Sequence, residues 1–513
     1  MDSYLILVIA LLILAVGDLI VGVSNDAVNF LNSAIGSRVA SRKVILSIAA
    51  VGIFAGAAFS SGMMEVARKG IFDPNFFSFA DVMIIFMAVM ITDIILLDAF
   101  NTLGMPTSTT VSIVFELLGA SVLVGWMMYR AETAPDYDFL DVINVEKASQ
   151  IIAGIFLSVG VAFSIGALAQ WLSRMLFTFS LNRAIRRIGS LFGGIALTII
   201  IYFLLIKGIK GADFGKNVNA WISTHTIDIV IYALLLSTLT LFILQRFFKV
   251  NPLRVVVFAG TFSLAMAFAG NDLVNFIGVP ITGYQSFNLW QDSGLPADNF
   301  MMSQLATAVQ TPKLLLLLAG LIMVVTLWFS AKAQKVTETE VKLGAQGDVD
   351  ERFKPNLVSR GIVSAAGAFN NFFTTVVPDR TISAINRRFT PVEIVEKDRP
   401  AFDLLRASVN LVIASILIAF ASSLKLPLST TYVSFMVAMG TSLADRAWGA
   451  HSAAYRVAGV VNVIGGWFLT AIIAFTASGF IALLIYFGGN WVALGLFVVA
   501  VAALINSNRR KKA

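Results

Sequence analysis

Two short polar motifs interrupt an otherwise apolar sequence, and each occurs twice. The first motif, Asn-Asp-x-x-Asn, comprises Asn25, Asp26 and Asn29 in one copy and Asn271, Asp272 and Asn275 in the other. Its amide and carboxylate oxygens are hard ligands, which suit an alkali or alkaline-earth cation and not a soft metal. Small residues nearby, among them Gly22 and Gly270, favour local unwinding of the helix. The motif therefore predicts a cation site formed by side chains and freed carbonyl oxygens.

The second motif is Pro-x-Ser-Thr-Thr, which begins at Pro106 and again at Pro427. Its hydroxyl residues are Ser108, Thr109 and Thr110 in one copy and Ser429, Thr430 and Thr431 in the other. Proline suits the first position of a helix, so the motif predicts a helix N-terminus with free backbone N–H groups. Many neutral donors at such an end suit an anion with several oxygens that must later be released.

Each motif has a simpler interpretation when it occurs alone. Asn and Asp are common N-caps at the end of a helix. Ser and Thr hydroxyls often bond to the preceding turn or help helices to pack in lipid. The duplication of both motifs favours a binding site, because polar groups inside a membrane are costly.

The two motifs also solve one electrostatic problem together. An anion held only by dipoles is expensive in a medium of low dielectric constant, and so are two uncompensated aspartates. Sodium ions or protons that neutralise Asp26 and Asp272 would remove both costs. Anion binding would then depend on cation binding, which is the physical requirement for a symporter.

The composition places these motifs in a membrane protein. Of the 513 residues, 58% are hydrophobic and 13% are charged, with a mean hydropathy of +0.85. Cysteine is absent, which excludes disulfides and thiolate sites, and the two histidines are too few for a histidine metal cluster. The net charge of +7 reflects loops and the C-terminus, so membrane orientation explains it without nucleic acid. No enzyme chemistry and no cofactor beyond coupling ions is expected.

The apolar runs predict an all-α, polytopic fold with about 9–12 transmembrane helices. Single spans are expected near 4–23, 44–64, 150–172, 189–206, 227–245, 253–270, 313–331, 457–487 and 490–505. Two further regions, 82–129 and 404–444, are interrupted in the middle by proline and the hydroxyl run. We interpret these two regions as re-entrant helical hairpins.

Positive charge predicts the topology. Loops that carry Arg42, Arg174, Arg183 and Arg246, and the basic tail at 509–512, should face the cytoplasm of a multi-pass cell-membrane protein. The N-terminus is then outside and the C-terminus inside. The two Asn-Asp helices would enter from opposite sides, as in transporters with inverted-topology repeats and a site near the midplane.

These boundaries divide the chain into four parts. The expected parts are a first repeat with connecting helices at 1–250, the start of the second repeat at 251–331, a cytoplasmic hydrophilic loop at 332–403 and the rest of the second repeat at 404–513. The loop is either a connector or a regulatory element, and its apolar stretch 362–377 suits the membrane surface.

Four further acids lie within or beside apolar runs. They are Asp18, Asp93, Asp98 and Glu116. Asp98 lies shortly before the first hydroxyl run, so it is a candidate accessory site for a cation or proton. The alternative is that it pairs with a neighbour.

At these two motif pairs the chain resembles the inorganic phosphate transporter (PiT) family. That family is marked by a duplicated Gly-Ala-Asn-Asp-x-x-Asn-Ala element and a duplicated Pro-x-Ser-Thr-Thr. The chain departs from the pattern at Ser24, Gly270, Phe30 and Phe276, and has Val111 and Tyr432 where the family often has His. The resemblance implies phosphate uptake driven by sodium or protons. It assigns the Asn-Asp residues to the cations and the Ser-Thr-Thr residues to phosphate.

We therefore expect a cation-coupled importer of inorganic phosphate that works by alternating access, with sodium favoured over the proton. The first alternative is a permease for sulfate or another oxyanion on the same scaffold. An ion channel is a weaker alternative, because channels favour rings of identical subunits over one duplicated site. The sequence leaves the oligomeric state open, a homodimer included.

Overall fold

Helices account for nearly all of the chain that is described. The computed structural model describes residues 2–58, 60, 70–103, 107–130, 139–179, 181–204, 216–306, 312–345, 378–389, 400–424, 426, 428–447 and 453–509, with isolated positions between 357 and 375. Within these ranges, β pairing is confined to two isolated bridges, Phe72 with Ile143 and Ser78 with Met301. Pro106 and Pro427 lie outside the described residues.

The helices are long and apolar, as lipid requires when every backbone polar group must be satisfied internally. The α-helices are α1 (Asp2–Asp26), α2 (Val28–Gly36), α3 (Arg42–Ala58), α5 (Phe79–Leu103), α6 (Thr109–Arg130), α7 (Val145–Phe177), α8 (Leu181–Ile201), α9 (Lys216–Thr224), α10 (Thr226–Phe247), α11 (Pro252–Ser293), α12 (Lys313–Phe329), α13 (Ala331–Gly344), α15 (Asp379–Arg388), α16 (Leu404–Ser423), α17 (Thr430–Ala444) and α18 (Ala453–Arg509). Short 3₁₀ turns occupy Pro74–Phe76, Phe139–Val142 and Ser303–Ala306.

Nine helical stretches in the described part of the chain are long and apolar enough to cross a membrane. A tenth is possible if α12 and α13, which meet at an angle of 70°, form one broken span. The predicted all-α, multi-pass fold is therefore confirmed. In α18 the backbone breaks at Gly489 (φ 66°), at the boundary expected between the spans 457–487 and 490–505.

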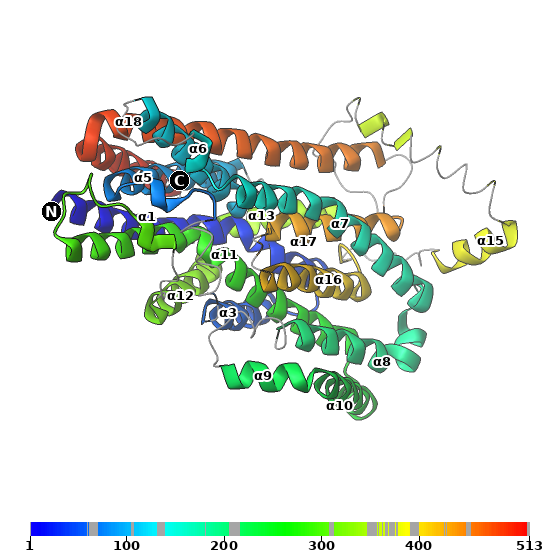
Figure 1. Ribbon diagram of the computed structural model, residues 1–513. Helices are drawn as coiled ribbons and strands as arrows, with labels where there is room; N and C mark the ends of the chain where they lie inside the picture. The colour runs from blue at the N-terminus through cyan, green and yellow to red at the C-terminus, as the bar shows by residue number, and fades with distance from the viewer. Residues whose placement is uncertain are drawn as a thin grey trace.

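The two helices that carry the Asn-Asp motifs run in opposite directions side by side (Figure 1). The start of α1 meets the end of α11, where the rings of Tyr4 and Trp290 lie 5.2 Å apart. The end of α1 meets the middle of α11, where Gly22 faces the ring of Phe276. Opposite directions were predicted from the charge pattern. The membrane side from which each helix enters, and the repeat relation itself, stay predictions.

Both regions expected to turn back do form helix hairpins. In the first, Phe100 of α5 packs with Phe115 of α6. In the second, the hydroxyl of Thr441 in α17 donates to Asn410 of α16 at 2.6 Å. Each hairpin tip carries one Ser-Thr-Thr run. The re-entrant position of these hairpins in a membrane stays a prediction.

The helices do not unwind at the Asn-Asp motifs, so that expectation is wrong. Helix α11 is continuous through Asn271 and Asp272, and only the helical turn at Ala27 (φ −54°, ψ −28°) separates α1 from α2. The reason is that the polar side chains find partners within the bundle, so the backbone hydrogen bonds are kept. The carbonyl oxygens of these helices are therefore not released for a ligand at the motif.

The predicted loop at 332–403 begins as a packed helix. The hydroxyl of Ser330, just before α13, donates to Ser24 of α1 at 2.7 Å, and the buried Glu340 accepts a hydrogen bond from Asn32 of α2. Helix α15 in the same segment buries none of its residues. Most of the apolar stretch 362–377 lies outside the described residues.

Arg174 was expected in a cytoplasmic loop, but it is buried within α7. Its guanidinium pairs with Asp445 at the end of α17 at 2.6 Å and with Asp403 before α16 at 2.8 Å. Burial raises the pKa of the Asp403 carboxyl, but the charges of Arg174 and Arg406 and the hydrogen bonds that they donate together outweigh burial and lower that pKa below its ordinary value. The paired carboxylates explain why this arginine is not in a solvated loop.

Helices α6 and α18 approach closely at Gly119. A Cβ atom there would lie 2.1 Å from the backbone oxygen of Phe475. We expect Gly119→Ala to destabilise the fold by about 1–3 kcal/mol, because the backbone of α18 must move. Gly160→Ala on α7 is the control, since nothing lies within 4 Å of a Cβ at that position. A thermal unfolding midpoint for Gly119→Ala no lower than that of Gly160→Ala would contradict this packing.

Candidate functional site

The twelve predicted motif residues converge in the interior. Those of the Asn-Asp motifs lie inside α1, α2 and α11, and those of the Ser-Thr-Thr motifs lie at the N-terminal ends of α6 and α17. All twelve side chains are buried. Both copies of both motifs meet in one place, although the chain separates them by hundreds of residues.

Each aspartate accepts hydrogen bonds from both hydroxyl runs. Asp26 accepts from Thr109 Oγ1 at 2.9 Å and from Thr431 Oγ1 at 3.1 Å. Asp272 accepts from Thr110 Oγ1 at 3.0 Å and from Thr430 Oγ1. Each carboxylate thus accepts a hydrogen bond from the first threonine of the motif in its own half of the chain and another from the second threonine of the motif in the other half. This exchange means that neither half forms a complete site.

The second asparagine of each motif also reaches across the halves. Asn29 Nδ2 donates to the hydroxyls of Thr430 and Thr431 at 3.3 and 3.0 Å. Correspondingly, Asn275 Nδ2 donates to Thr109 and Thr110 at 3.4 and 3.0 Å. Each threonine hydroxyl therefore accepts from an amide and donates to a carboxylate. The four hydroxyl protons are all directed at the two aspartates.

The serines of the motifs act as helix caps. Ser108 Oγ accepts from the N–H of Val111 at 3.1 Å, and Ser429 Oγ accepts from the N–H of Tyr432 at 3.1 Å. The helices consequently begin at Thr109 and Thr430, and the predicted proline start is wrong. Serine is a strong N-cap and takes this position from the proline. The cap bonds leave each serine hydroxyl proton available for donation.

The first asparagine of each motif contacts the loop before the serine. Asn25 Oδ1 accepts from the N–H of Thr107 at 3.0 Å, and Asn271 Nδ2 donates to the carbonyl of Leu428 at 2.8 Å. These two bonds fix the hairpin tips against α1 and α11. Both asparagines therefore position the hydroxyl runs as well as flanking the aspartates.

Two positioning residues were not predicted from the sequence. Asn101 accepts from Asn25 Nδ2 at 2.7 Å, and Ser422 donates to Asn271 Oδ1 at 3.3 Å. Their spacing in the sequence could have revealed them, because Asn101 precedes Pro106 by the same number of residues as Ser422 precedes Pro427. The residue types differ, which conceals the correspondence.

The site contains two carboxyl groups and no cationic partner among the described residues. Asp26 and Asp272 accept from the adjacent residues Thr109 and Thr110, and the described hydrogen-bond partners of both carboxyls are neutral hydroxyls and amides. Two buried carboxylates without a positive partner are costly. Within the described residues, no group of three or more His, Cys, Asp or Glu side chains could hold a metal ion. A cation here would be bound by carboxylate, amide and hydroxyl oxygens, which suit a hard ion.

Asp98 does not reach this site. Its carboxylate forms an ion pair with Lys332 Nζ of α13. Asp98 is therefore paired with a neighbour, which was the alternative interpretation. The amino group of Lys332 lies at the carboxylate for which an accessory cation or proton was predicted.

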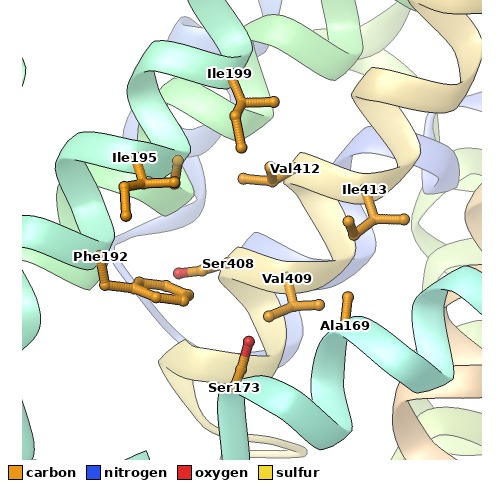
Figure 2. Close-up of a pocket in the computed structure, with 10 residues that line it drawn as sticks. Ala169, Ser173, Phe192, Ile195, Ile199, Ser408, Val409, Val412 and Ile413 are labelled. Carbon is orange, nitrogen blue, oxygen red and sulfur yellow. The ribbon is translucent and has the colours of Figure 1, made fainter. Parts of the chain in front are cut away.

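A separate cavity of about 130 Å³ lies between α7, α8 and α16 (Figure 2). Phe192 and Ile195 line one side and Val409 and Val412 the other, with Ser173 and Ser408 as its polar side chains. It includes none of the motif residues, and its apolar walls do not suit an oxyanion.

Comparisons with known proteins identify relatives of this chain. Residues 22–339 match the model of the PHO4 phosphate transporter family. Over 267 residues the chain is 26% identical to a Pyrococcus abyssi protein named "Putative phosphate permease", covering 50% of this chain and 61% of that protein. A Thermococcus kodakarensis protein with the same description is 27% identical over 271 residues, again covering 50% and 61%. The match thus spans less than two thirds of the length of these relatives.

A solved structure shares the fold. A protein described as "The sodium-dependent phosphate transporter" superimposes with a TM-score of 0.64, covering 94% of this chain and 99% of that chain. The sequence identity is 16%, so the likeness concerns the fold alone.

Proposed function

Since this chain belongs to the phosphate transporter family, whose members are transporters and not enzymes, we propose that it imports inorganic phosphate coupled to a cation. The proposed cation is sodium, with the proton as the alternative. Phosphate would bind to Ser108, Thr109, Thr110, Ser429, Thr430 and Thr431. The cations would bind to Asn25, Asp26, Asn29, Asn271, Asp272 and Asn275.

One observation carries the proposal, namely that the four threonine hydroxyls donate to Asp26 and Asp272. Phosphate oxygens need the same hydroxyl protons, so the anion and the carboxylates compete for them. A cation bound to a carboxylate neutralises its charge, so that the carboxylate accepts hydrogen bonds less strongly. Cation binding therefore releases donors for phosphate, and the two solutes bind together.

The exchange of threonines between halves supports alternating access. Each aspartate holds one hairpin tip from each half, so a tilt of one half against the other would break two of the four bonds. Bound phosphate could bridge the tips in place of the aspartates. We propose that this replacement links substrate binding to the movement of the halves. The proposed topology has the N-terminus outside and the C-terminus in the cytoplasm of a cell-membrane protein.

Uptake by purified protein in liposomes tests this function. We expect radiolabelled phosphate to accumulate above its external concentration under an inward sodium or proton gradient, and not when an ionophore collapses that gradient. Liposomes without protein supply the background. Equal uptake without either gradient would indicate a facilitator or channel. Competition by sulfate and not by arsenate would identify another oxyanion as the substrate.

A further inference from the structure

Three buried acids on α1, α5 and α6 have carboxylate oxygens without a hydrogen-bond partner among the described residues. Asp18 of α1, Asp93 of α5 and Glu116 of α6 are each fully buried. Within the described part of the chain, both carboxylate oxygens of Asp18, both of Asp93 and Oε2 of Glu116 have no donor, and Asp18 and Asp93 lie next to each other. Only Glu116 Oε1 is satisfied, by the hydroxyl of Ser112 at 2.8 Å. We call these three residues the acidic cluster.

The acidic cluster shares its three helices with the central site. Asp18 lies two turns before Asn25 on α1, Asp93 lies about two turns before Asn101 on α5, and Glu116 lies two turns after Thr109 on α6. Two helical turns correspond to about 11 Å. Figure 1 shows α1, α5 and α6 packed together on one side of the molecule. The acidic cluster therefore lies about two helical turns from the central site, on the same three helices.

The cluster occurs only once, in contrast to the central motifs. The positions in the same register relative to the second motif pair are Leu264, Ala414 and Val437. These residues are also buried, and all three are apolar. The fold thus accepts apolar side chains at such positions, so packing alone does not explain three acids in the first half.

The charges around the cluster do not neutralise it. The charged groups that act on Asp18 are Asp93, Glu116 and Asp26, all of which are acids. Lys332 pairs with Asp98, and α18 contributes the hydroxyl of Ser478 to the backbone oxygen of Glu116 at 2.7 Å. Buried carboxylates without a positive partner are stable only when they bind a cation or a proton.

We propose that the acidic cluster is a monovalent-cation site, for sodium or a proton, which is separate from the central site and carries one additional coupling ion. The cation lies between Asp18 and Asp93, the adjacent pair, with Glu116 beside them. Among the described residues, no group of three or more His, Cys, Asp or Glu side chains could hold a metal ion, so the proposed site is formed by the pair of Asp18 and Asp93. The coupling role depends on the proposed function, whereas cation binding does not.

The test counts cations in phosphate-free buffer at neutral pH. It uses purified full-length protein in detergent, with Asp26→Asn and Asp272→Asn to remove the central carboxylates. Equilibrium binding of radioactive sodium detects a sodium site, and the infrared carbonyl band of a protonated carboxyl detects a proton site. We expect one cation equivalent in one of the two measurements, and we expect Asp93→Asn to remove it.

Asp81→Asn is the matched control. Asp81 is also an acid of α5, but its carboxylate accepts from the N–H and hydroxyl of Ser78 at the start of the helix. The control should keep the cation equivalent. If Asp93→Asn does not fold, Asp18→Asn is measured in its place, because it removes the other half of the carboxyl pair.

Unchanged sodium binding and an unchanged infrared band in folded Asp93→Asn or Asp18→Asn protein would overturn the proposal. Absence of both signals before either substitution would overturn it as well. Failure of the wild-type protein to accumulate phosphate in liposomes is a different result, because it would refute the proposed function and leave the binding measurement valid.

Discussion

Asp26→Asn and Asp272→Asn are each expected to lower sodium-dependent or proton-dependent phosphate accumulation by about 100-fold or more. Each substitution removes the negative charge that attracts the cation, and its amide nitrogen faces threonine hydroxyls that donate to the carboxylate in the structure. A hydrogen bond to a charged group contributes about 1.5–3 kcal/mol, and each aspartate accepts at least two. The measurement is the initial rate of uptake in liposomes as a function of the cation concentration.

Asp292→Asn is the control for this prediction. It removes a carboxylate from the same helix as Asp272, but at an exposed position near the end of α11. Its cation dependence should equal that of the wild type. Wild-type cation dependence in both Asp26→Asn and Asp272→Asn would refute the role of the aspartates in coupling.

Thr110→Val and Thr431→Val are expected to raise the phosphate concentration for half-maximal uptake by about 10–100-fold each. Valine has nearly the same shape as threonine, so the change removes a donor from the anion site with little loss of packing. The expected factor corresponds to one hydrogen bond with a charged partner, about 1.5–3 kcal/mol. These two threonines are the ones that each half contributes to the aspartate of the other half.

Thr282→Val supplies the matched control for the hydroxyl prediction. Thr282 is buried on α11, and its hydroxyl donates to the carbonyl of Gly278 one turn earlier in the same helix. The double variant of Thr110 and Thr431 should lose more than either single variant. If Thr282→Val impaired uptake as strongly as Thr110→Val, the effect would come from packing and not from phosphate.

The sequence was sufficient to single out the twelve motif residues that meet in the interior, because both motifs are duplicated. A single Asn-Asp pair or a single Ser-Thr-Thr run has a simpler explanation as a cap or a packing contact. Opposite helix directions followed from the positions of Arg and Lys. Both features are local patterns, so one sequence displays them without knowledge of the packing.

The sequence could not show the pairing within the site. Asp26 accepts a hydrogen bond from Thr431, and Asp272 accepts one from Thr110. These pairings depend on how the two halves face each other, and no local sequence pattern encodes them. The continuous helix at Asn271 and the buried Arg174 were missed for the same reason, because partners distant in sequence compensate their polar groups. Asn101 and Ser422 were missed because equivalent positions carry different residue types.

The position of two carboxylates inside a ring of hydroxyl donors has a consequence for selectivity. Hydrogenphosphate carries both acceptor oxygens and a P–OH group, so it can accept from the threonines and donate to an aspartate. Sulfate has no proton at neutral pH, and its oxygens would meet Asp26 and Asp272 as acceptor against acceptor. In the proposed site the hydroxyls would donate to any tetrahedral oxyanion, and the aspartates would favour the anion that still carries a proton.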